Sequence, residues 1–269
     1  MSKTWFITGA SRGLGRAWML AALERGDRVA AGVRNLADLA DLAPLYDGRL
    51  LPLRVDVTRR GDVFDAIDRA VTMFGRLDVV VANAGFALFG MVEESSEEQA
   101  RAQFDANFFG ALWVAQAALP HLRAQGSGHI LVTSSLAGII AFPTAGIYNA
   151  TKWALEGLFE SLALEVADFG IKVTLVEPGG YATDWRGASA SHAEQMPAYD
   201  GLRETLRANY VSRQPGDPAA TGAAILAVVD APEPPLRFFL GDAGLPATER
   251  AYGERLKIWR AWAATSEAA

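Results

Sequence analysis

Short apolar runs alternate along this 269-residue chain with longer stretches in which apolar residues return every three or four positions. The first pattern is typical of β-strands, and the second of helices that bury one face. Strands are predicted at 4–8, 28–33, 50–56, 77–85, 128–135, 171–179 and 236–241. Helices are predicted from the turn after the first strand to about Arg25, and at 59–74, 96–124, 147–168 and 217–230.

Strand followed by helix, repeated along the chain, predicts an α/β protein with a parallel sheet and helices on both of its faces. The run "LDVVVANAG" at 77–85 is almost entirely apolar, which suits a strand buried on both faces. Pro52 lies in the third predicted strand. Because proline has no N–H to donate to a neighbour, this strand is expected at an edge of the sheet.

Two segments depart from this pattern within what we interpret as one domain spanning 1–269. Residues 180–215 show no strand pattern and are interpreted as a substrate loop. The tail at 242–269 has a helical pattern that carries Trp259 and Trp262. Each of the two segments could form a lid, make an oligomer contact or simply pack on the domain, and the sequence leaves these three roles open.

Composition and charge exclude several classes of function. The net charge of −6 argues against binding nucleic acid through a basic surface. The chain has no cysteine, which excludes disulfides and thiolate catalysis, and its three histidines lack metal-ligand spacing, so no metal site is expected. No apolar run approaches the roughly 18 residues of a membrane span, and the N-terminal one is too short for a signal peptide. We expect a cytoplasmic protein without membrane partners.

The segment "TGASRGLGRA" at 8–17 joins the first strand to the first helix and holds Gly9, Gly13 and Gly15. Their spacing is not G-x-G-x-x-G. Glycine nevertheless lets the backbone approach a pyrophosphate, and a helix N-terminus offers free N–H groups and a positive dipole end. An ordinary glycine turn is the alternative. Three glycines in seven residues, directly after the first strand of a β-α-β pattern, favour a dinucleotide site.

The end of the second strand bears on which dinucleotide binds. An acidic residue about 20 positions beyond the glycine turn usually holds the ribose 2′-hydroxyl of NAD. Here "AAGVRN" places Arg34 there, and no acid follows until Asp38. Arg12 lies within the glycine turn. Two arginines can bind a 2′-phosphate, so we predict NADP, with NADPH preferred over NADH. The alternative is that both arginines are solvated surface charges.

Several further motifs follow the glycine turn at characteristic places. "NAG" (83–85) ends the fourth strand, "NFFG" (107–110) lies on the next helix, "YNATK" follows Ser135 by thirteen residues, and "PGG" precedes Thr183. With "TGASRGLG" they resemble the single-domain branch of the short-chain dehydrogenase/reductase family, over about 4–185. The resemblance implies a doubly wound, Rossmann-type sheet of seven parallel strands in the order 3-2-1-4-5-6-7.

The resemblance implies a catalytic set of Asn107, Ser135, Tyr148 and Lys152. Tyr148 and Lys152 are four residues apart and so share one face of a helix. A nearby ammonium favours the phenolate, so we expect Lys152 to lower the Tyr148 pKa from its usual value of ~10. Tyr148 would exchange a proton with the substrate oxygen, which Ser135 also binds. By resemblance, Lys152 would hold the nicotinamide ribose and Asn107 a water. Taken singly, Ser135 could be a serine at a strand end, Asn107 a helix-capping residue, and Tyr148 and Lys152 a solvated surface pair. Only the occurrence of all four at the family's spacing favours catalysis.

Further cofactor and substrate contacts follow from the same resemblance. Asp56 resembles an acid that binds the adenine amine, although an acid before helix 59–74 also suits a helix N-terminus. The expected cofactor residues are Gly9, Ser11, Arg12, Gly13, Leu14, Gly15, Arg34, Asp56, Asn83, Ala84, Gly85, Tyr148, Lys152, Pro178, Gly179 and Thr183. The expected substrate residues are Phe86, Leu88, Leu136, Phe142, Tyr181 and Trp185, with the loop at 186–215. Most are apolar, which favours an uncharged, lipophilic ketone, aldehyde or secondary alcohol.

Three functions remain open at this point. The leading one is an NADP(H)-dependent oxidoreductase that moves hydride between nicotinamide and a carbonyl or secondary alcohol, with Tyr148 as acid/base. A second is an NAD-dependent alcohol dehydrogenase with the same site. A third is a non-catalytic NADP-sensing regulator, which would not need the full catalytic set. Members of the family are often dimers or tetramers, so we expect a homo-oligomer built on helices 96–124 and 147–168.

Overall fold

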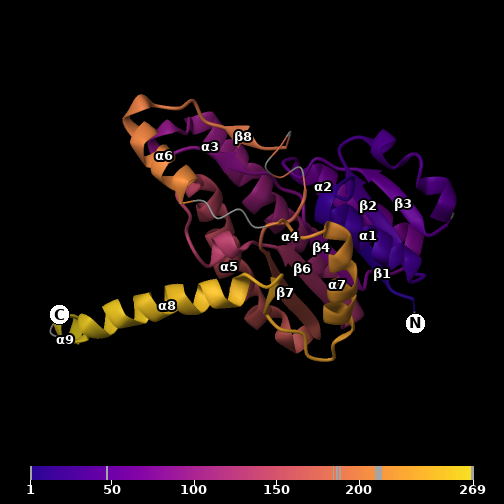
Figure 1. Cartoon of the computed structure of the whole chain (residues 1–269). Coiled ribbons are helices and arrows are strands. Elements are labelled where there is room, and N and C mark those ends of the chain that lie inside the picture. Colours follow the sequence, from indigo (N-terminus) through magenta and orange to yellow (C-terminus); the bar gives the residue numbers. More distant parts are fainter. Residues whose placement is uncertain are drawn as a thin grey trace.

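The computed structural model describes residues 2–46, 48–183, 185, 187, 189–209 and 214–267. Its centre is a seven-stranded parallel sheet in the order β3-β2-β1-β4-β6-β7-β9 (Figure 1). The strands are β1 (Thr4–Thr8), β2 (Arg28–Val33), β3 (Leu50–Arg54), β4 (Val79–Ala82), β6 (Gly128–Thr133), β7 (Ile171–Pro178) and β9 (Arg237–Leu240). The predicted sheet and strand order are confirmed, and Pro52 lies on the edge strand β3.

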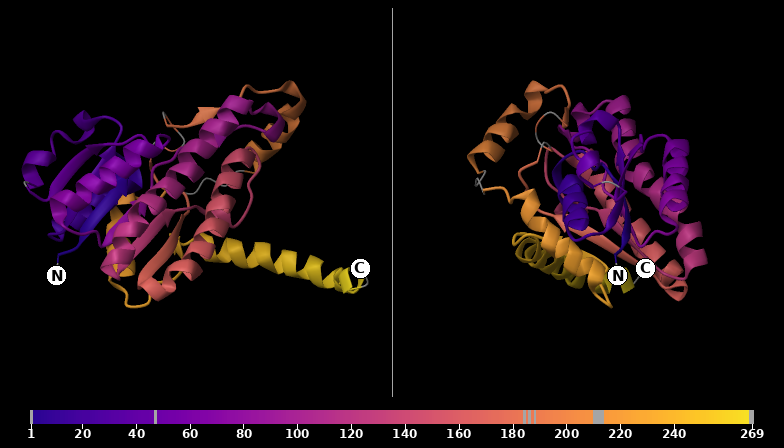
Figure 2. Two further views of the ribbon diagram at one scale, coloured as in Figure 1. Left: turned by 180° about the vertical axis from the view of Figure 1, so that it is seen from behind. Right: turned by 90° about the vertical axis from the view of Figure 1, so that its right-hand side faces the viewer.

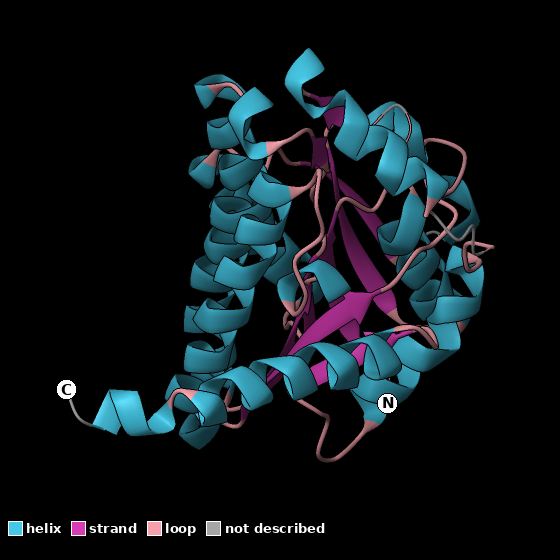
Figure 3. Ribbon diagram, turned by 60° about the vertical axis from the view of Figure 1, so that its left-hand side comes forward, coloured by secondary structure: helices cyan, strands magenta, loops and turns pink. Residues whose placement is uncertain are grey.

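Helices cover both faces of the sheet (Figure 3). Because side chains alternate along a strand, β1 supplies two separate cores: Trp5 and Ile7 pack with α1 and α7, and Phe6 packs with α2, α4 and α5. The helices are α1 (Gly13–Glu24), α2 (Arg60–Phe74), α3 (Glu97–Phe104), α4 (Gly110–Gln125), α5 (Gly146–Val166), α6 (Asp200–Ala208), α7 (Thr221–Asp230), α8 (Gly244–Ala261) and α9 (Ala263–Glu267). The architecture is the Rossmann-type fold that the sequence predicts.

The single helix predicted over 96–124 changes its winding in the middle. Ser96 caps the N-terminus of α3 by accepting from the backbone N–H of Gln99, whose side chain bonds back to the Ser96 N–H. A π-helical turn, η4 (Asp105–Phe109), then connects α3 to α4. Such single π-turns are frequent at functional sites, and this one contains Asn107.

The expectation that 180–215 contains no strand is wrong. A two-residue strand, β8 (Ser191–His192), pairs in parallel with β5 (Leu88–Phe89), and α6 follows it. The backbone N–H groups of Ser191 and Ala193 donate to the carbonyls of Ala87 and Phe89, both at 2.8 Å. Two residues are too few to produce a recognisable alternation of apolar and polar positions. Residues 184, 186, 188 and 210–213 of the predicted loop lie outside the described residues.

Short 3-10 turns connect several of these elements. They are η1 (Leu36–Leu39), η2 (Ala43–Tyr46), η3 (Val92–Glu94), η5 (Leu136–Gly138), η6 (Ala167–Phe169), η8 (Pro197–Tyr199) and η9 (Pro218–Ala220). The last one precedes α7, so the helix predicted from residue 217 becomes regular α-helix at Thr221.

Helix α8 projects from the body of the protein as an arm that ends in α9 (Figures 1 and 2). Arg255 contacts the body: its guanidinium lies 4.9 Å from the centre of the Trp153 ring on α5, and it donates to the carbonyl of Ile139 at 3.1 Å. Beyond this point the arm exposes Trp259 and Trp262, at 61% and 63% of their surface. The last two residues of the predicted tail, 268–269, lie outside the described residues.

Candidate active site

The turn after β1 has no room for side chains at two of its glycines. Gly9 has a positive φ of 66°, and a Cβ there would lie 2.9 Å from the Cα of Ala84. A Cβ at Gly15 would collide with the carbonyl oxygen of Gly9 and the amide of Asn83. Glycine therefore leaves a bare backbone cradle at the N-terminus of α1, which fits the close approach of a dinucleotide pyrophosphate. Ser11 and Leu14 are half-buried in the same turn, and Arg12 is exposed just before α1.

Asn83 fastens this cradle to the sheet. Its Nδ2 donates to the carbonyl of Thr8 at 3.0 Å, and its Oδ1 accepts from the hydroxyl of Thr133 at 3.1 Å. The hydroxyl of Thr8 in turn accepts from the backbone N–H groups of Asn83 and Ala84. Three strand ends are thereby locked together around the turn. Sequence reasoning missed Thr8 and Thr133, whose only signal is their position near the carboxyl ends of two predicted strands, which flank β4 in the sheet.

The segment after β7 reaches the cradle from the other side. Pro178 ends β7, and the N–H of Gly179 donates to the carbonyl of Leu240 at 3.1 Å. A Cβ built on Gly13 would lie 3.3 Å from the Cγ2 of Thr183, so the predicted nicotinamide-end threonine lies beside the glycine turn.

Arg34 and Asp56 lie at the carboxyl ends of β2 and β3, on the same edge as the glycine turn. Arg34 is exposed, and among the described residues it has no ion-pair partner. Asp56 Oδ1 accepts from the backbone N–H and hydroxyl of Thr58, at 3.0 and 2.8 Å. The carboxylate of Asp56 thus helps to shape the turn before α2, as its structural reading predicts.

Tyr148, Ser135 and Lys152 come together at the carboxyl end of β6. Tyr148 and Lys152 are buried on one face of α5, and the Lys152 Nζ lies 5.7 Å from the centre of the Tyr148 ring. Ser135 lies two residues after the end of β6 and hydrogen-bonds to the Tyr148 hydroxyl, while its Oγ accepts from the N–H of Ala137. Lys152 donates to the carbonyl of Thr133 at 2.7 Å. Three of the four predicted catalytic residues therefore form one cluster.

The expectation that Lys152 lowers the Tyr148 pKa is wrong for this structure. Burial raises the pKa of Tyr148 to about 12, and the hydrogen bonds from Ser135 and Trp185 offset this only in part. Burial also lowers the pKa of Lys152 to about 8, against the opposing charge of Glu156. Burial disfavours both charged forms more strongly than the neighbouring groups favour them. Tyr148 is therefore a neutral phenol at neutral pH, able to donate its proton.

Asn107 clamps the backbone next to this cluster. Its Oδ1 accepts from the N–H of Phe86 at 3.0 Å, and its Nδ2 donates to the Phe86 carbonyl at 2.9 Å. A Cβ at Gly85 would lie 2.8 Å from the Asn107 Oδ1, so a glycine is needed for this approach. The side chain of Asn107 thus holds the segment after β4 in place.

The predicted substrate residues divide between the cluster and other sites. Trp185 packs on Tyr148, with ring centroids 5.2 Å apart, and on Phe89, also at 5.2 Å. Phe89 was missed because it lies in the two-residue strand β5. Leu88 is buried, with 1% of its surface exposed, and its substrate contact stays a prediction. Phe86 is half-buried, and Phe142 is exposed.

Tyr181 and Leu136 lie further from Tyr148. The ring of Tyr181 packs against Gly216 and the core around α1 and α7, away from the catalytic cluster, so its substrate role is not supported. Leu136, next to Ser135, lines a cavity of about 320 Å³ whose other walls are Asp242, Ala243, Pro246, Ala247 and Arg250. The start of α8 therefore reaches the surroundings of Ser135, which no sequence motif indicated.

Within the described ranges, no three His, Cys, Asp or Glu side chains gather in a way that could hold a metal ion. None of the helices in the described part of the chain combines the length and apolarity needed to cross a membrane.

Comparisons with known proteins agree with this geometry. Residues 3–194 match the family model described as short chain dehydrogenase. The chain is 42% identical to the protein named Oxidoreductase BOA17 from Botryotinia fuckeliana, over 90% of this chain and 89% of that protein. It superposes with a TM-score of 0.91 on the crystal structure of a short-chain dehydrogenase from Streptomyces avermitilis, at 36% identity, covering 100% of this chain and 98% of that one.

Two other solved structures contain a nicotinamide cofactor. An alcohol dehydrogenase from Thermococcus sibiricus, complexed with 5-hydroxy-NADP, is 27% identical with a TM-score of 0.75, covering 91% of this chain and 98% of that one. A short chain dehydrogenase/reductase from Burkholderia phymatum, in complex with NAD, is 25% identical with a TM-score of 0.80, covering 96% and 95%.

Proposed function

This chain belongs to the short-chain dehydrogenase family, whose members are oxidoreductases that use a nicotinamide cofactor, and we propose that it reduces carbonyl compounds with NADPH. The observation that carries the proposal is the buried cluster of Tyr148, Ser135 and Lys152 beside the glycine cradle.

Reduction requires a hydride and a proton, and a bound reduced nicotinamide supplies the hydride. Tyr148 supplies the proton, since it is a neutral phenol at neutral pH and its hydroxyl lies at the catalytic cluster. Ser135 already hydrogen-bonds to the Tyr148 hydroxyl, so both groups can reach one substrate oxygen and stabilise the negative charge that develops there.

Lys152 and Asn107 support this acid. Lys152 has three donor hydrogens and uses one on the Thr133 carbonyl, which leaves two for the ribose hydroxyls of the cofactor. Its positive charge would stabilise the tyrosinate that remains when Tyr148 gives up its proton. Asn107 holds the backbone at Phe86 and so fixes one wall of the site. In this proposal the resemblance adds a water held at Asn107.

The preference for NADPH is supported by Arg34 and Arg12. Both are exposed on the edge of the sheet where the glycine turn lies, and the residue after Arg34 is an asparagine, not an acid. Asn35 is occupied as the cap of η1, accepting from the N–H of Ala37. A 2′-phosphate would therefore meet two guanidinium groups and no carboxylate of the kind that binds the 2′-hydroxyl of NAD.

For the substrate we propose an uncharged, lipophilic ketone or aldehyde. The groups next to Tyr148 are the rings of Trp185 and Phe89 and the small side chains of Ala87, Ala137 and Ala145. Apolar walls around one hydrogen-bonding point favour a substrate with a single carbonyl in an apolar frame.

For assembly we propose a homo-oligomer. The described arm exposes Leu256, Ile258, Trp259 and Trp262, which an isolated chain would leave in water. Light scattering tests this, with Trp259→Ser as the variant. A monomer for the unmodified chain contradicts the proposal.

The proposed reduction is tested by mixing the protein with NADPH and a panel of ketones and aldehydes, and following the loss of reduced-nicotinamide absorbance. Turnover that Tyr148→Phe abolishes supports the proposal. Tight nucleotide binding without turnover on any compound would instead support a regulator that senses NADP, and faster turnover with NADH would support the NAD-dependent alternative.

A further inference from the structure

Below Lys152, one turn further along α5, lies a second buried charged side chain. Glu156 is 5% exposed. Its Oε1 accepts a short hydrogen bond from the hydroxyl of Ser134, and its Oε2 accepts from the Arg237 Nε at 2.9 Å. Because it follows Lys152 by four residues, it lies on the same face of α5. The proposed mechanism makes no use of it.

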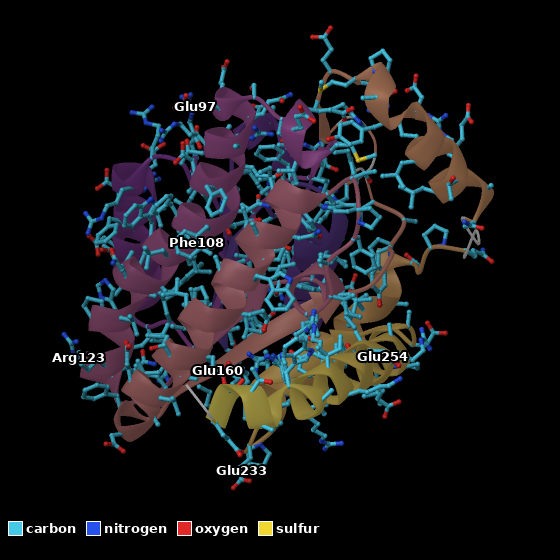
Figure 4. All side chains as sticks on the ribbon, turned by 90° about the vertical axis from the view of Figure 1, so that its left-hand side faces the viewer. Glu97, Phe108, Arg123, Glu160, Glu233 and Glu254 are labelled. Carbon is cyan, nitrogen blue, oxygen red and sulfur yellow. The ribbon has the colours of Figure 1, made fainter. Side chains whose placement is uncertain are left out.

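Arg237 connects Glu156 to two further carboxylates. It lies on β9, donates to Glu160 Oε2 at 2.7 Å, and approaches Glu177 Oε1 on β7 to 3.8 Å. Glu177 is fully buried, and neither of its carboxylate oxygens has a hydrogen-bond partner. Glu160, labelled in Figure 4, is half exposed.

The two buried acids therefore differ in ionisation. Burial raises the pKa of Glu156, but the hydrogen bonds from the Ser134 hydroxyl and the Arg237 guanidinium, together with the charges of Arg237 and Lys152, oppose this rise and favour the charged form. Glu177 accepts none, and burial followed by the charge of Glu156 raises its pKa to about 8. Glu156 thus carries the buried negative charge of this cluster, and Glu177 carries a proton at neutral pH.

Room for this arrangement comes from Gly138 in η5. A Cβ there would lie 2.8 Å from the Ser134 Oγ and 3.0 Å from the Glu156 Cγ. The backbone next to Ser135 is thereby packed directly on the carboxylate.

Lys152 is surrounded by few other charges. On α5 it has Tyr148 and Glu156, β6 offers the carbonyl of Thr133, and η4 offers the neutral Asn107. β7 contributes the protonated Glu177, and β9 contributes Arg237, whose charge is shared between Glu156 and Glu160. Acids on the neighbouring α3, such as Glu97, are exposed to water, which screens them.

We propose that Glu156 is a positioning residue that keeps Lys152 protonated, through a carboxylate charge held in place by Ser134 and Arg237. Burial alone drives Lys152 toward its neutral form, and Glu156 provides the opposing negative charge. The importance of this charge for catalysis rests on the proposed function, in which a protonated Lys152 stabilises the charge at Tyr148 and binds ribose.

The test measures the titration of Lys152 directly in the cofactor-free protein. The chain has four lysines, Lys3, Lys152, Lys172 and Lys257, and Lys152 alone among them is buried. NMR of protein labelled with ¹³C at the lysine ε-carbons gives one signal for each, and Lys152→Arg assigns the signal of interest. In the unmodified protein this signal is expected to titrate near pH 8.

Glu156→Gln keeps the shape of the side chain and one of its two acceptor oxygens, and removes the charge. We expect it to lower the Lys152 midpoint by about one pH unit, the lower end of the range for losing a close opposite charge. Glu160→Gln is the matched control, since it removes an acid from the same helix and the same arginine but at the surface. It is expected to leave the midpoint unchanged. The signals of the other three lysines verify that each variant is folded.

An unchanged midpoint in Glu156→Gln, or an equal change in Glu160→Gln, overturns the proposal. If Glu156→Gln does not fold, Ser134→Ala replaces it: removal of one hydrogen bond makes Glu156 easier to protonate, so a smaller shift in the same direction is expected. No shift there also overturns the proposal.

The titration needs no substrate and no nucleotide, so it is independent of the proposed reduction. Where turnover is found, the alkaline limb of the kcat/KM profile should move to lower pH with the Lys152 midpoint. If Glu156→Gln lowers the Lys152 midpoint as expected but the protein shows no turnover, the proposed function is contradicted and the role of Glu156 is supported.

Discussion

The indole ring of Trp185 packs on the phenol ring of Tyr148, with centroids 5.2 Å apart and ring planes at 64°. A hydrogen bond from Trp185 also reaches the Tyr148 hydroxyl. This hydroxyl is the group that must meet the substrate oxygen in the proposed reaction. In that reaction Trp185 would compete with the substrate for the Tyr148 hydroxyl.

Trp185→Phe removes the competing N–H and keeps an aromatic ring. We expect kcat/KM for ketones to rise roughly twofold to tenfold, since one neutral hydrogen bond contributes about 0.5–1.5 kcal/mol. Steady-state kinetics measure this, with Trp153→Phe on the outer side of α5 as the control. A fall in kcat/KM would mean that the indole N–H helps to bind the substrate.

Tyr148→Phe removes the proposed proton donor without changing the shape of the ring. Turnover should fall by about 10²–10⁴-fold, the usual contribution of a general acid, while the Kd for NADPH stays the same. Tyr181→Phe is the control, because that ring packs against Gly216 away from the cluster. Unchanged turnover in Tyr148→Phe would assign the proton transfer to another group.

Arg12→Ala and Arg34→Ala test the recognition of the 2′-phosphate. Each should lower kcat/KM with NADPH by about tenfold or more, because a charged hydrogen bond contributes about 1.5–3 kcal/mol. The value with NADH should not change. Arg123→Ala, at the far end of α4, is the control. Equal losses with both nucleotides would show that the arginines do not recognise the phosphate.

Glu177→Gln should change how stability depends on pH. The folded protein keeps the Glu177 proton up to a pH of about 8, whereas the unfolded chain releases it near 4.5. Between these values the folded state binds more protons, so Glu177 makes the free energy of unfolding fall as pH rises. The variant lacks this group and should gain stability relative to the unmodified protein between pH 5 and 8, on the order of a few kcal/mol.

Urea unfolding at several pH values measures this difference, with Glu160→Gln as the control. The window from pH 6.5 to 8 is the cleanest. Burial lowers the pKa of His129 to about 4, so below 6.5 the unfolded state binds the additional proton and this histidine makes stability rise with pH. A stability difference between Glu177→Gln and the unmodified protein that does not vary with pH would show that Glu177 is ionised in the folded state.

The sheet could be predicted from the sequence because its strands are buried on both faces. Such strands are uninterrupted apolar runs, and the seven predicted strands correspond to those of the main sheet with boundaries differing by up to three residues. The pair β5 and β8 could not be predicted, because two hydrogen-bonded residues leave no periodic pattern. The π-turn at Asn107 was also missed, since one extra residue per turn leaves the apolar spacing nearly intact.

The candidate site was predictable where short motifs carry the chemistry, as for Gly9, Ser135, Tyr148 and Lys152. It was not predictable where the chemistry depends on burial. The pKa of Tyr148 rises because little water surrounds the phenol. The spacing of Tyr148 and Lys152 in the sequence does not show how deeply they are buried. The pairing of Glu156 with Arg237 likewise joins α5 to β9 across 81 residues of sequence.

The most direct test of the central claim compares the unmodified protein with Tyr148→Phe on one ketone panel, with NADPH and with NADH. The account predicts turnover of at least one uncharged, lipophilic carbonyl compound, faster with NADPH, and its loss in the variant while NADPH still binds. Turnover that persists at the same rate in Tyr148→Phe would contradict it.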